Sequence, residues 1–255
     1  MTGQIHQSRI DGSIVLLELD NPPMNALGPA MLRQAEAALH EIEHDTSVRA
    51  LVLTGRGRAF CSGADLKAFA ADGPEQAARD IEHFNRVLEL VARCRAPTIA
   101  AVNGHCLGGG FELALCCDLR IASTEAKFVC AGVNVGLMAS TYRLPRLIGL
   151  SRAKAMLLTG AAHDAATALA WGLVTELQTP DQLLPAALHL ARRVASRAPL
   201  SVEASKRVAD RAFDLSPAEA DELIAREMAV LRASHDHQEA LSAFLAKREP
   251  VFGRR

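Results

Sequence analysis

Residues 102–114 read VNGHCLGGGFELA, in which three consecutive glycines directly precede a helix-forming run that has Glu112 in its first turn. A ligand atom can come close to a glycine backbone because no Cβ is in the way. The first N–H groups of a helix have no partners inside it, and that helix end carries partial positive charge. Glu112 follows Gly109 by three residues and so shares its helical face. The pattern predicts a site that stabilises an anion beside an acid–base group. Tight packing of the helix on a strand is the alternative.

The composition is that of an ordinary globular protein. The chain has 255 residues, 49% of them hydrophobic and 22% charged, and its formal net charge is −1. Such a balance gives no electrostatic reason to expect binding to nucleic acid or to an anionic membrane. No apolar run approaches the roughly 20 residues that span a bilayer, and residues 1–11 have neither the basic start nor the apolar centre of a signal peptide. We therefore expect a cytoplasmic protein, or one of an organellar matrix whose targeting segment is absent from this chain.

Cysteine and histidine give no sign of a metal site. The six cysteines contain no Cys-x-x-Cys pair, and the nine histidines are scattered along the chain. Cysteines without a regular spacing are typical of reduced, buried small side chains. We expect no metal.

Strand and helix signals alternate in the first half of the chain, which favours an α/β fold with parallel strands. Strands are expected over residues 13–20, 48–53 and 98–102, and helices from Pro29 to Ile42 and over residues 74–93. Beyond residue 150 helices dominate, and the pattern predicts them over residues 151–158, 165–171, 181–196, 201–213 and 217–246, the last with a break near His235.

A second glycine-containing loop, residues 55–67 (GRGRAFCSGADLK), also follows an expected strand and leads towards a helix. If both loops lie at the carboxyl edge of adjacent parallel strands, a ligand would meet two sets of free backbone N–H groups, which is the composition of an oxyanion hole. A plain surface connection is the alternative. The Gly-x-Ser-x-Gly nucleophile motif, the phosphate loop of nucleotide-binding proteins and the dinucleotide fingerprint are all absent from the sequence.

Both loops together resemble those of the enoyl-CoA hydratase/isomerase, or crotonase, superfamily. The similarity extends over nearly the whole chain and is carried by residues 21–27 (Asn-Pro-x-x-Asn-Ala-Leu), 58–67, 96–122, 132–150 and 244–252. The resemblance implies an α/β, crotonase-like spiral of ββα units with a C-terminal helical trimerisation region. It divides the chain into a spiral core, residues 1–195, and a helical region, residues 196–255. It also implies a homo-trimer or hexamer.

The same resemblance implies what the site does. An acyl-CoA thioester would place its carbonyl oxygen between the N–H groups of Ala64 and Gly109, with Glu112 as the catalytic acid/base. Coenzyme A is part of this substrate, so no separate cofactor is expected. Asp118 matches a family position that we interpret as structural. The residues implied in binding CoA and substrate are Ala26, Ala64, Asp65, Leu66, Lys67, Phe244 and Lys247.

The chain departs from the family pattern at a second catalytic position. Family hydratases carry another glutamate twenty residues after the first, and Gly132 stands there in this chain. The glycine-rich link that follows is shortened to residues 138–144, which alters the expected wall of the acyl pocket. Hydration needs one group for the water and one for the α-proton, and a lone carboxylate does both poorly. Candidates for the missing role are Asp72, Glu75, Asp80, Glu82, His105, Cys130 and Tyr142.

Three functions remain open at this stage. The first is hydration or isomerisation of an enoyl-CoA through a thioester enolate, with Glu112 as the only retained family acid/base. The second is another acyl-CoA reaction, such as thioester hydrolysis or decarboxylation. The third is a weakly active or non-catalytic acyl-CoA-binding protein.

Overall fold

The expected parallel strands form a six-stranded sheet in the computed structural model, which describes residues 3–71 and 73–255. Its strand order is β1-β2-β3-β5-β7-β10; β1 is antiparallel to β2, and all other neighbours are parallel. The strands are β1 (Gln4–Ile10), β2 (Ile14–Asp20), β3 (Ala50–Gly55), β5 (Thr98–Val102), β7 (Leu119–Ser123) and β10 (Glu176–Gln178).

A second, smaller sheet has the order β4-β6-β8-β9. Its strands are β4 (Ala59–Cys61), β6 (His105–Leu107), β8 (Lys127–Val129) and β9 (Ala162–Asp164). The chain alternates between the sheets: β3 is followed by β4, β5 by β6 and β7 by β8, and each pair leads to helical structure. This is the expected spiral of ββα units.

Helices cover both faces of the large sheet, which explains why its strands are apolar without interruption. Alternate residues of β3 point to opposite faces: Leu51 and Leu53 join the core beneath α1 and α3, whereas Ala50 and Val52 pack with α8. The helices of this part of the chain are α1 (Pro29–His44), α2 (Leu66–Ala71), α3 (Pro74–Ala92), α4 (Gly108–Cys116), α5 (Arg143–Ile148), α6 (Leu150–Thr159), α7 (Ala165–Ala170) and α8 (Pro180–Ala195), with a 3-10 turn at Ala131–Val135.

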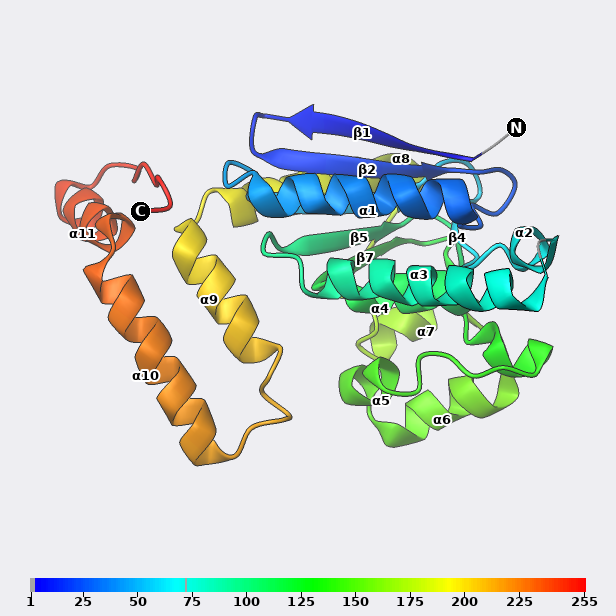
Figure 1. Cartoon of the computed structure of the whole chain (residues 1–255). Helices are drawn as coiled ribbons and strands as arrows, with labels where there is room; N and C mark the ends of the chain where they lie inside the picture. Colours follow the sequence, from blue (N-terminus) through cyan, green and yellow to red (C-terminus); the bar gives the residue numbers. More distant parts are fainter. Residues whose placement is uncertain (1–2, 72) are drawn as a thin grey trace.

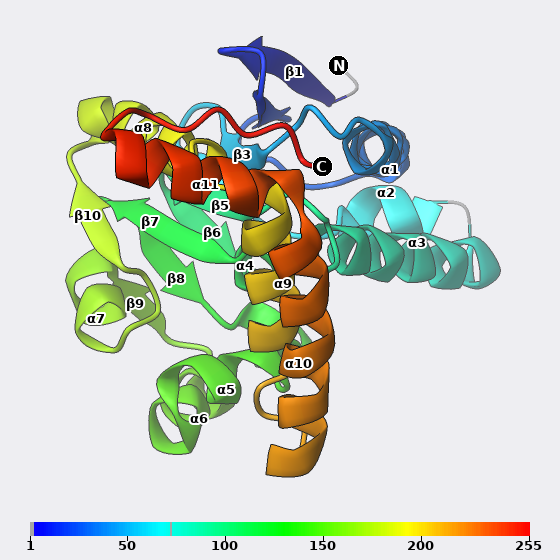
Figure 2. The same cartoon turned by 90° about the vertical axis from the view of Figure 1, so that its left-hand side faces the viewer.

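Three helices follow α8 and project from the body of the molecule (Figure 1). They are α9 (Pro199–Ala209), α10 (Pro217–Ala233) and α11 (His235–Ala246). Figure 2 shows α9 and α10 side by side, with α11 at the end of α10. The expected break near His235 lies at Ser234, whose hydroxyl accepts a hydrogen bond from the His237 N–H and so begins α11. None of the described helices is long and apolar enough to cross a membrane.

Some elements differ from the sequence expectation. Helix α9 ends at Ala209 rather than near Phe213, because the chain turns through residues 210–215 and a capping box at Ser216 starts α10. Strand β1 was not predicted, since its largely polar residues form a half-exposed edge. The strands of the small sheet have three residues each, too few for a periodic pattern.

Candidate active site

The two glycine loops meet at Gly63 and Gly109. A Cβ added to Gly63 would lie 2.6 Å from the Gly109 nitrogen, and Gly63 has a φ of +95°, so only glycine fits there without strain. Gly109 is the second residue of α4, where backbone N–H groups have no partner within the helix. The loops approach because β3 and β5, which lead into them, are adjacent parallel strands.

The backbone of Ala64 is turned towards this meeting point by its pairing with Leu27. The Leu27 N–H donates to the Gly63 carbonyl at 2.8 Å, and the Leu27 carbonyl accepts from the Asp65 N–H at 3.1 Å. Leu27 thus bonds to both neighbours of Ala64 in a parallel bridge, which leaves the Ala64 N–H pointing to the opposite side. The arrangement leaves the Ala64 N–H available to a ligand.

Two asparagines hold the loop of residues 55–67 in place. The buried Asn25 side chain donates to the carbonyls of Arg56 at 2.9 Å and Ala59 at 2.7 Å. The Asn103 side chain donates to the Gly57 carbonyl at 2.9 Å and accepts from the Gly55 N–H at 3.1 Å. Amide side chains can do this because each combines donors and an acceptor. These bonds explain the asparagines in the sequence signal at residues 21–27 and in the Asn-Gly pair before the glycine run.

Glu112 follows Gly109 by one helical turn and is held by an arginine. Its side chain is 12% exposed, and Arg143 Nη1 donates to its Oε1 at 3.0 Å. Arg143 also contacts Glu89 of α3, Nη2 to Oε2, at 3.2 Å. Burial opposes the charged guanidinium, but Cys116 and Glu112 raise the pKa of Arg143 above its ordinary value. The second oxygen of Glu112, Oε2, is buried and has no hydrogen-bond partner among the described residues.

The Arg143 contact was not foreseen from the sequence. Arg143 lies in the shortened link after Gly132, whose effect on the acyl-pocket wall was the only available signal. The structure therefore adds an arginine to the environment of the retained glutamate.

At Gly132 the backbone is packed too closely for a larger residue. A Cβ there would lie 2.9 Å from the Leu137 carbonyl oxygen and 3.1 Å from the Ala139 nitrogen. The Leu137 N–H also donates to the Gly132 carbonyl at 2.8 Å. The segment after Gly132 folds back over the position that a second glutamate would need.

Most of the other acid–base candidates are in unsuitable surroundings. Glu75 and Glu82 are exposed on α3. Tyr142 is 60% exposed and lies against the Arg146 guanidinium, 4.6 Å from its ring centroid. Burial, with Glu112 nearby, raises the pKa of the Cys130 thiol to about 12, so this thiol keeps its proton at neutral pH.

The other three acid–base candidates are His105, Asp80 and Asp72. His105 is half-buried in β6. Asp80 is buried on α3, and one of its carboxylate oxygens lacks a partner among the described residues. Asp72 lies outside the described residues.

The residues expected to bind CoA form two separate groups within one chain. Ala26 precedes the Leu27–Ala64 bridge, and residues 64–67 lead from it into α2, whose first turn Asp65 caps through its side chain. Phe244 and Lys247 instead lie on or just after α11, which Figure 1 shows at the opposite end of the molecule from α2. The structure brings together Ala26, Ala64, Gly109 and Glu112, and it leaves Phe244 and Lys247 away from them.

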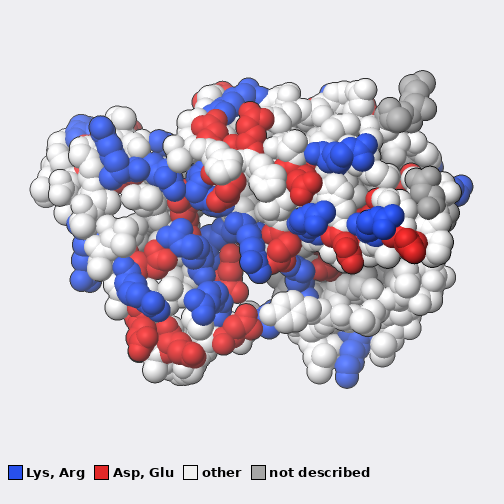
Figure 3. Space-filling model, viewed as in Figure 1, with Lys and Arg blue, Asp and Glu red and all other residues white. Residues whose placement is uncertain are grey.

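A cavity of about 1500 Å³ separates the C-terminal helices from the body. Ala64, Gly109 and Glu112 do not line it, although Arg143 does. Its lining has ten arginines and one lysine against seven acidic residues, and Figure 3 shows basic side chains gathered along this gap.

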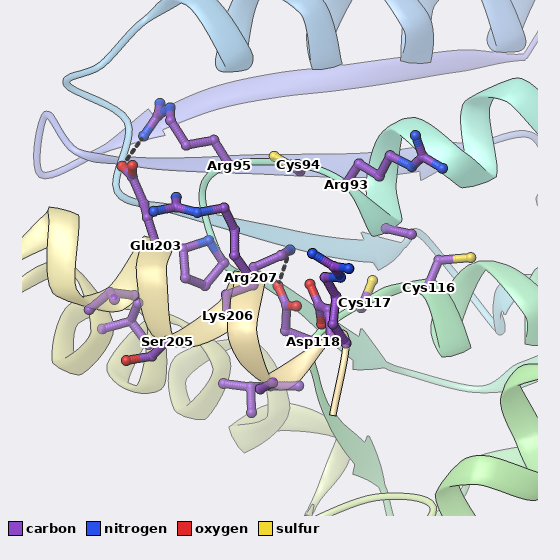
Figure 4. Close-up of a pocket in the computed structure, with 18 of the residues that line it drawn as sticks. Arg93, Cys94, Arg95, Cys116, Cys117, Asp118, Glu203, Ser205, Lys206 and Arg207 are labelled. Atoms are coloured by element: carbon purple, nitrogen blue, oxygen red, sulfur yellow. Dashed lines mark hydrogen bonds and ion pairs between the residues drawn. The ribbon is translucent and has the colours of Figure 1, made fainter. Parts of the chain in front are cut away.

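Many of these charged side chains form ion pairs, and some of the pairs join α9 to the body of the molecule (Figure 4). Lys206 contacts Asp118 at 2.7 Å, and Arg95 contacts Glu203 at 2.9 Å. Asp118 also accepts from the Thr98 N–H at 2.6 Å, which is consistent with a structural role. Across the residues that the structure describes, no group of His, Cys, Asp and Glu side chains is placed to hold a metal ion.

Comparison with known proteins shows the family of the chain. Residues 9–255 match the family model described as enoyl-CoA hydratase/isomerase. The chain belongs to the enoyl-CoA hydratase/isomerase family. It is 38% identical over 248 residues, 96% of each chain, to a probable enoyl-CoA hydratase of Rhizobium meliloti (strain 1021). It is 36% identical over 245 residues, 94% of each chain, to a crotonyl-CoA hydratase of Syntrophomonas wolfei.

The solved structures extend the family likeness to the whole fold. An enoyl-CoA hydratase from Bacillus anthracis superimposes with a TM-score of 0.95 at 31% identity, covering 98% of this chain and 99% of that one. The crotonase-type architecture, including the C-terminal helical region, is therefore that of the family. The chain is thus a member of an enzyme family.

Proposed function

We propose that this protein acts on an acyl-CoA thioester and hydrates or isomerises an enoyl-CoA through an enolate. The thioester oxygen would accept hydrogen bonds from the N–H groups of Ala64 and Gly109. Donors fixed before the reaction stabilise the charge that develops on this oxygen, and one such donor is typically worth about 3 to 4 kcal/mol. The contact between Gly63 and Gly109, with Glu112 one turn further along α4, is the observation that carries the proposal.

Glu112 is the acid/base of this mechanism. Arg143 holds one carboxylate oxygen and leaves Oε2 without a partner among the described residues, so this oxygen can accept a proton. The site needs no cofactor beyond the coenzyme A that forms part of the substrate.

The functional form would be a homo-trimer or hexamer. Large apolar side chains of the C-terminal helices are exposed in the single chain, among them Met228, Leu241 and Leu245. Exposed apolar surface of this kind is typical of subunit interfaces. In such an assembly Phe244 and Lys247 could approach the CoA bound to a neighbouring copy.

Turnover of 2-enoyl-CoA and 3-enoyl-CoA substrates by the wild type and by Glu112→Gln tests this function. Interconversion by the wild type, with a loss of about 100-fold or more in Glu112→Gln, supports it. Equal rates in the two proteins would remove Glu112 from the mechanism.

The packing at Gly132 favours a second candidate function. Because the backbone of residues 137–139 occupies the space of the family's second glutamate, the site could instead perform thioester hydrolysis or decarboxylation. Release of free CoA or carbon dioxide from a panel of acyl-CoA thioesters, without hydration of any enoyl-CoA, would favour this reading. Binding without any turnover would favour a non-catalytic role.

A further inference from the structure

Asp80 is a buried carboxylate with an unused oxygen. Asp80 is 5% exposed and is the first of the buried residues along α3, and the buried residues that follow it are apolar. The Gln76 side chain donates to Asp80 Oδ1 at 2.9 Å, whereas Oδ2 is buried and has no hydrogen-bond partner among the described residues. Such an oxygen is costly to bury, so it marks a place where a partner is expected.

The position of Asp80 relates it to the candidate oxyanion hole. Phe84 follows Asp80 by four residues and shares its buried face, about 6 Å further along the helix. The Phe84 ring lies over Gly109, since a Cβ added to Gly109 would be 2.7 Å from the Phe84 Cζ atom. Asp80 is therefore one helical turn from the side chain that packs against Gly109.

The contact between Phe84 and Gly109 relates Asp80 on α3 to Glu112 on α4. Phe84 pairs with Gly109, and Glu89, five residues later on α3, is joined to Glu112 through Arg143. Along both α3 and α4, the residue nearer the N-terminus (Phe84 or Gly109) belongs to the first contact and the later residue (Glu89 or Glu112) to the second. Glu112 lies about 4.5 Å beyond Gly109 along α4, and Asp80 lies about 6 Å before Phe84 along α3.

The partners of the two carboxylates differ. Glu112 is bound to a guanidinium in a charge-assisted contact. Asp80 is bound to a neutral amide, and no ion pair joins it to a cation in the described part of the chain.

We propose that Asp80 is the second acid–base group of the site, moving the proton at the α-carbon while Glu112 serves the water at the β-carbon. This rests on the proposed function. In hydration, Glu112 takes a proton from water as the water oxygen bonds to the β-carbon, and the double-bond electrons move into the enolate. Protonated Asp80 then gives its proton to the α-carbon, and the enolate electrons form that bond. Exchange with solvent returns a proton to Asp80 and removes one from Glu112, so water alone is consumed.

Two reactions separate the roles of the two carboxylates. One is hydration of crotonyl-CoA, and the other is exchange of the α-protons of butyryl-CoA with deuterium oxide, which involves no water addition. Asp80→Asn should lower both rates by about 100-fold or more, with KM changed less than about threefold. Glu112→Gln should lower hydration strongly and leave α-proton exchange within about threefold of the wild type. Glu82→Gln, an exposed acid on the same helix, is the matched control and should change neither rate.

Each outcome decides the proposal. Asp80→Ser serves as a second variant, and thermal melting reports whether each variant is folded. If Asp80→Asn or a folded Asp80→Ser exchanges α-protons as fast as the wild type, Asp80 is not the second group, and the proposed function stands. A change confined to KM would assign Asp80 to binding and overturn its catalytic role. A wild type without hydration, isomerisation or exchange would overturn the proposed function and this inference together.

Discussion

Arg143 donates to Glu112 over 3.0 Å, and this ion pair joins the short helix α5 to α4, of which Glu112 is the fifth residue. Glu112 is the residue that the family resemblance identifies as the acid/base, and Arg143 belongs to the link in which this chain departs from the family. The pair therefore connects the retained half of the site to its altered half.

Replacing Arg143 should lower activity without weakening substrate binding. Arg143→Gln removes the contact that orients Glu112, and misplacement of a catalytic group by about 1 Å can cost about 100-fold in rate. We expect kcat on an enoyl-CoA to fall about 10- to 100-fold, with little change in KM. Arg93→Gln is the control, because Arg93 is an exposed partner of the same Glu89 and does not contact Glu112. An unchanged kcat in Arg143→Gln would show that Glu112 does not need this partner.

Replacing Gly63 should damage the candidate oxyanion hole. In Gly63→Ala the new methyl group would lie 2.6 Å from the Gly109 nitrogen, so the two loops must separate. Loss of one oxyanion donor typically costs 100- to 1000-fold in kcat, and we expect a loss of about that size. Gly57→Ala is a matched control: Gly57 also has a positive φ, +73°, but a Cβ there meets nothing within 4 Å. Similar kcat values for the two variants would mean that loop separation is not what matters.

Restoring the family glutamate at residue 132 should not increase hydration. Gly132→Glu places its Cβ 2.9 Å from a backbone oxygen, so the segment 137–139 must move. We expect a loss of about 1 to 3 kcal/mol in the free energy of unfolding, measured by urea denaturation. Gly132→Ala, with the same Cβ and no carboxylate, should be destabilised to a similar degree. A gain in crotonyl-CoA hydration by Gly132→Glu would show that this segment adjusts to the family course.

The stability contributed by the ion pairs of Glu203, which join α9 to the body, should depend on pH. Burial alone would raise the pKa of Glu203, but hydrogen bonds from Arg254 and Arg95 outweigh it, and this pKa lies below its ordinary value of 4.5. A lowered pKa in the folded state gives stability that is present above pH 4.5 and is lost as the pH falls through the folded-state pKa. Glu203→Gln should therefore be destabilised by about 3 kcal/mol at pH 7.

Measuring the free energy of unfolding at several pH values tests this role of Glu203. The difference in free energy of unfolding between the wild type and Glu203→Gln should shrink as the pH falls below 4.5. Asp11→Asn removes one member of an exposed ion pair with Arg192 and should change stability by less than about 1 kcal/mol. A difference for Glu203→Gln that is constant between pH 7 and pH 3 would contradict this assignment.

The sequence predicts the long elements and the backbone part of the site, because both depend on local patterns. Strand β5 has the expected bounds, and Gly109 and Glu112 share one helical face as their spacing requires. The contact between Arg143 and Glu112 could not be predicted, because it depends on how the shortened link folds back. The burial of Asp80 depends on packing around α3 and is likewise absent from local patterns, since neighbouring acids on this helix are exposed.

A crystal structure with a bound, slowly reacting acyl-CoA would show where the thioester oxygen and the acyl carbons lie in the site. We predict that the thioester oxygen lies about 2.7 to 3.1 Å from the backbone nitrogens of both Ala64 and Gly109, with the α- and β-carbons between Glu112 and Asp80. A thioester bound elsewhere, for instance in the arginine-lined cavity beside α9, or one that contacts neither nitrogen, would contradict the account.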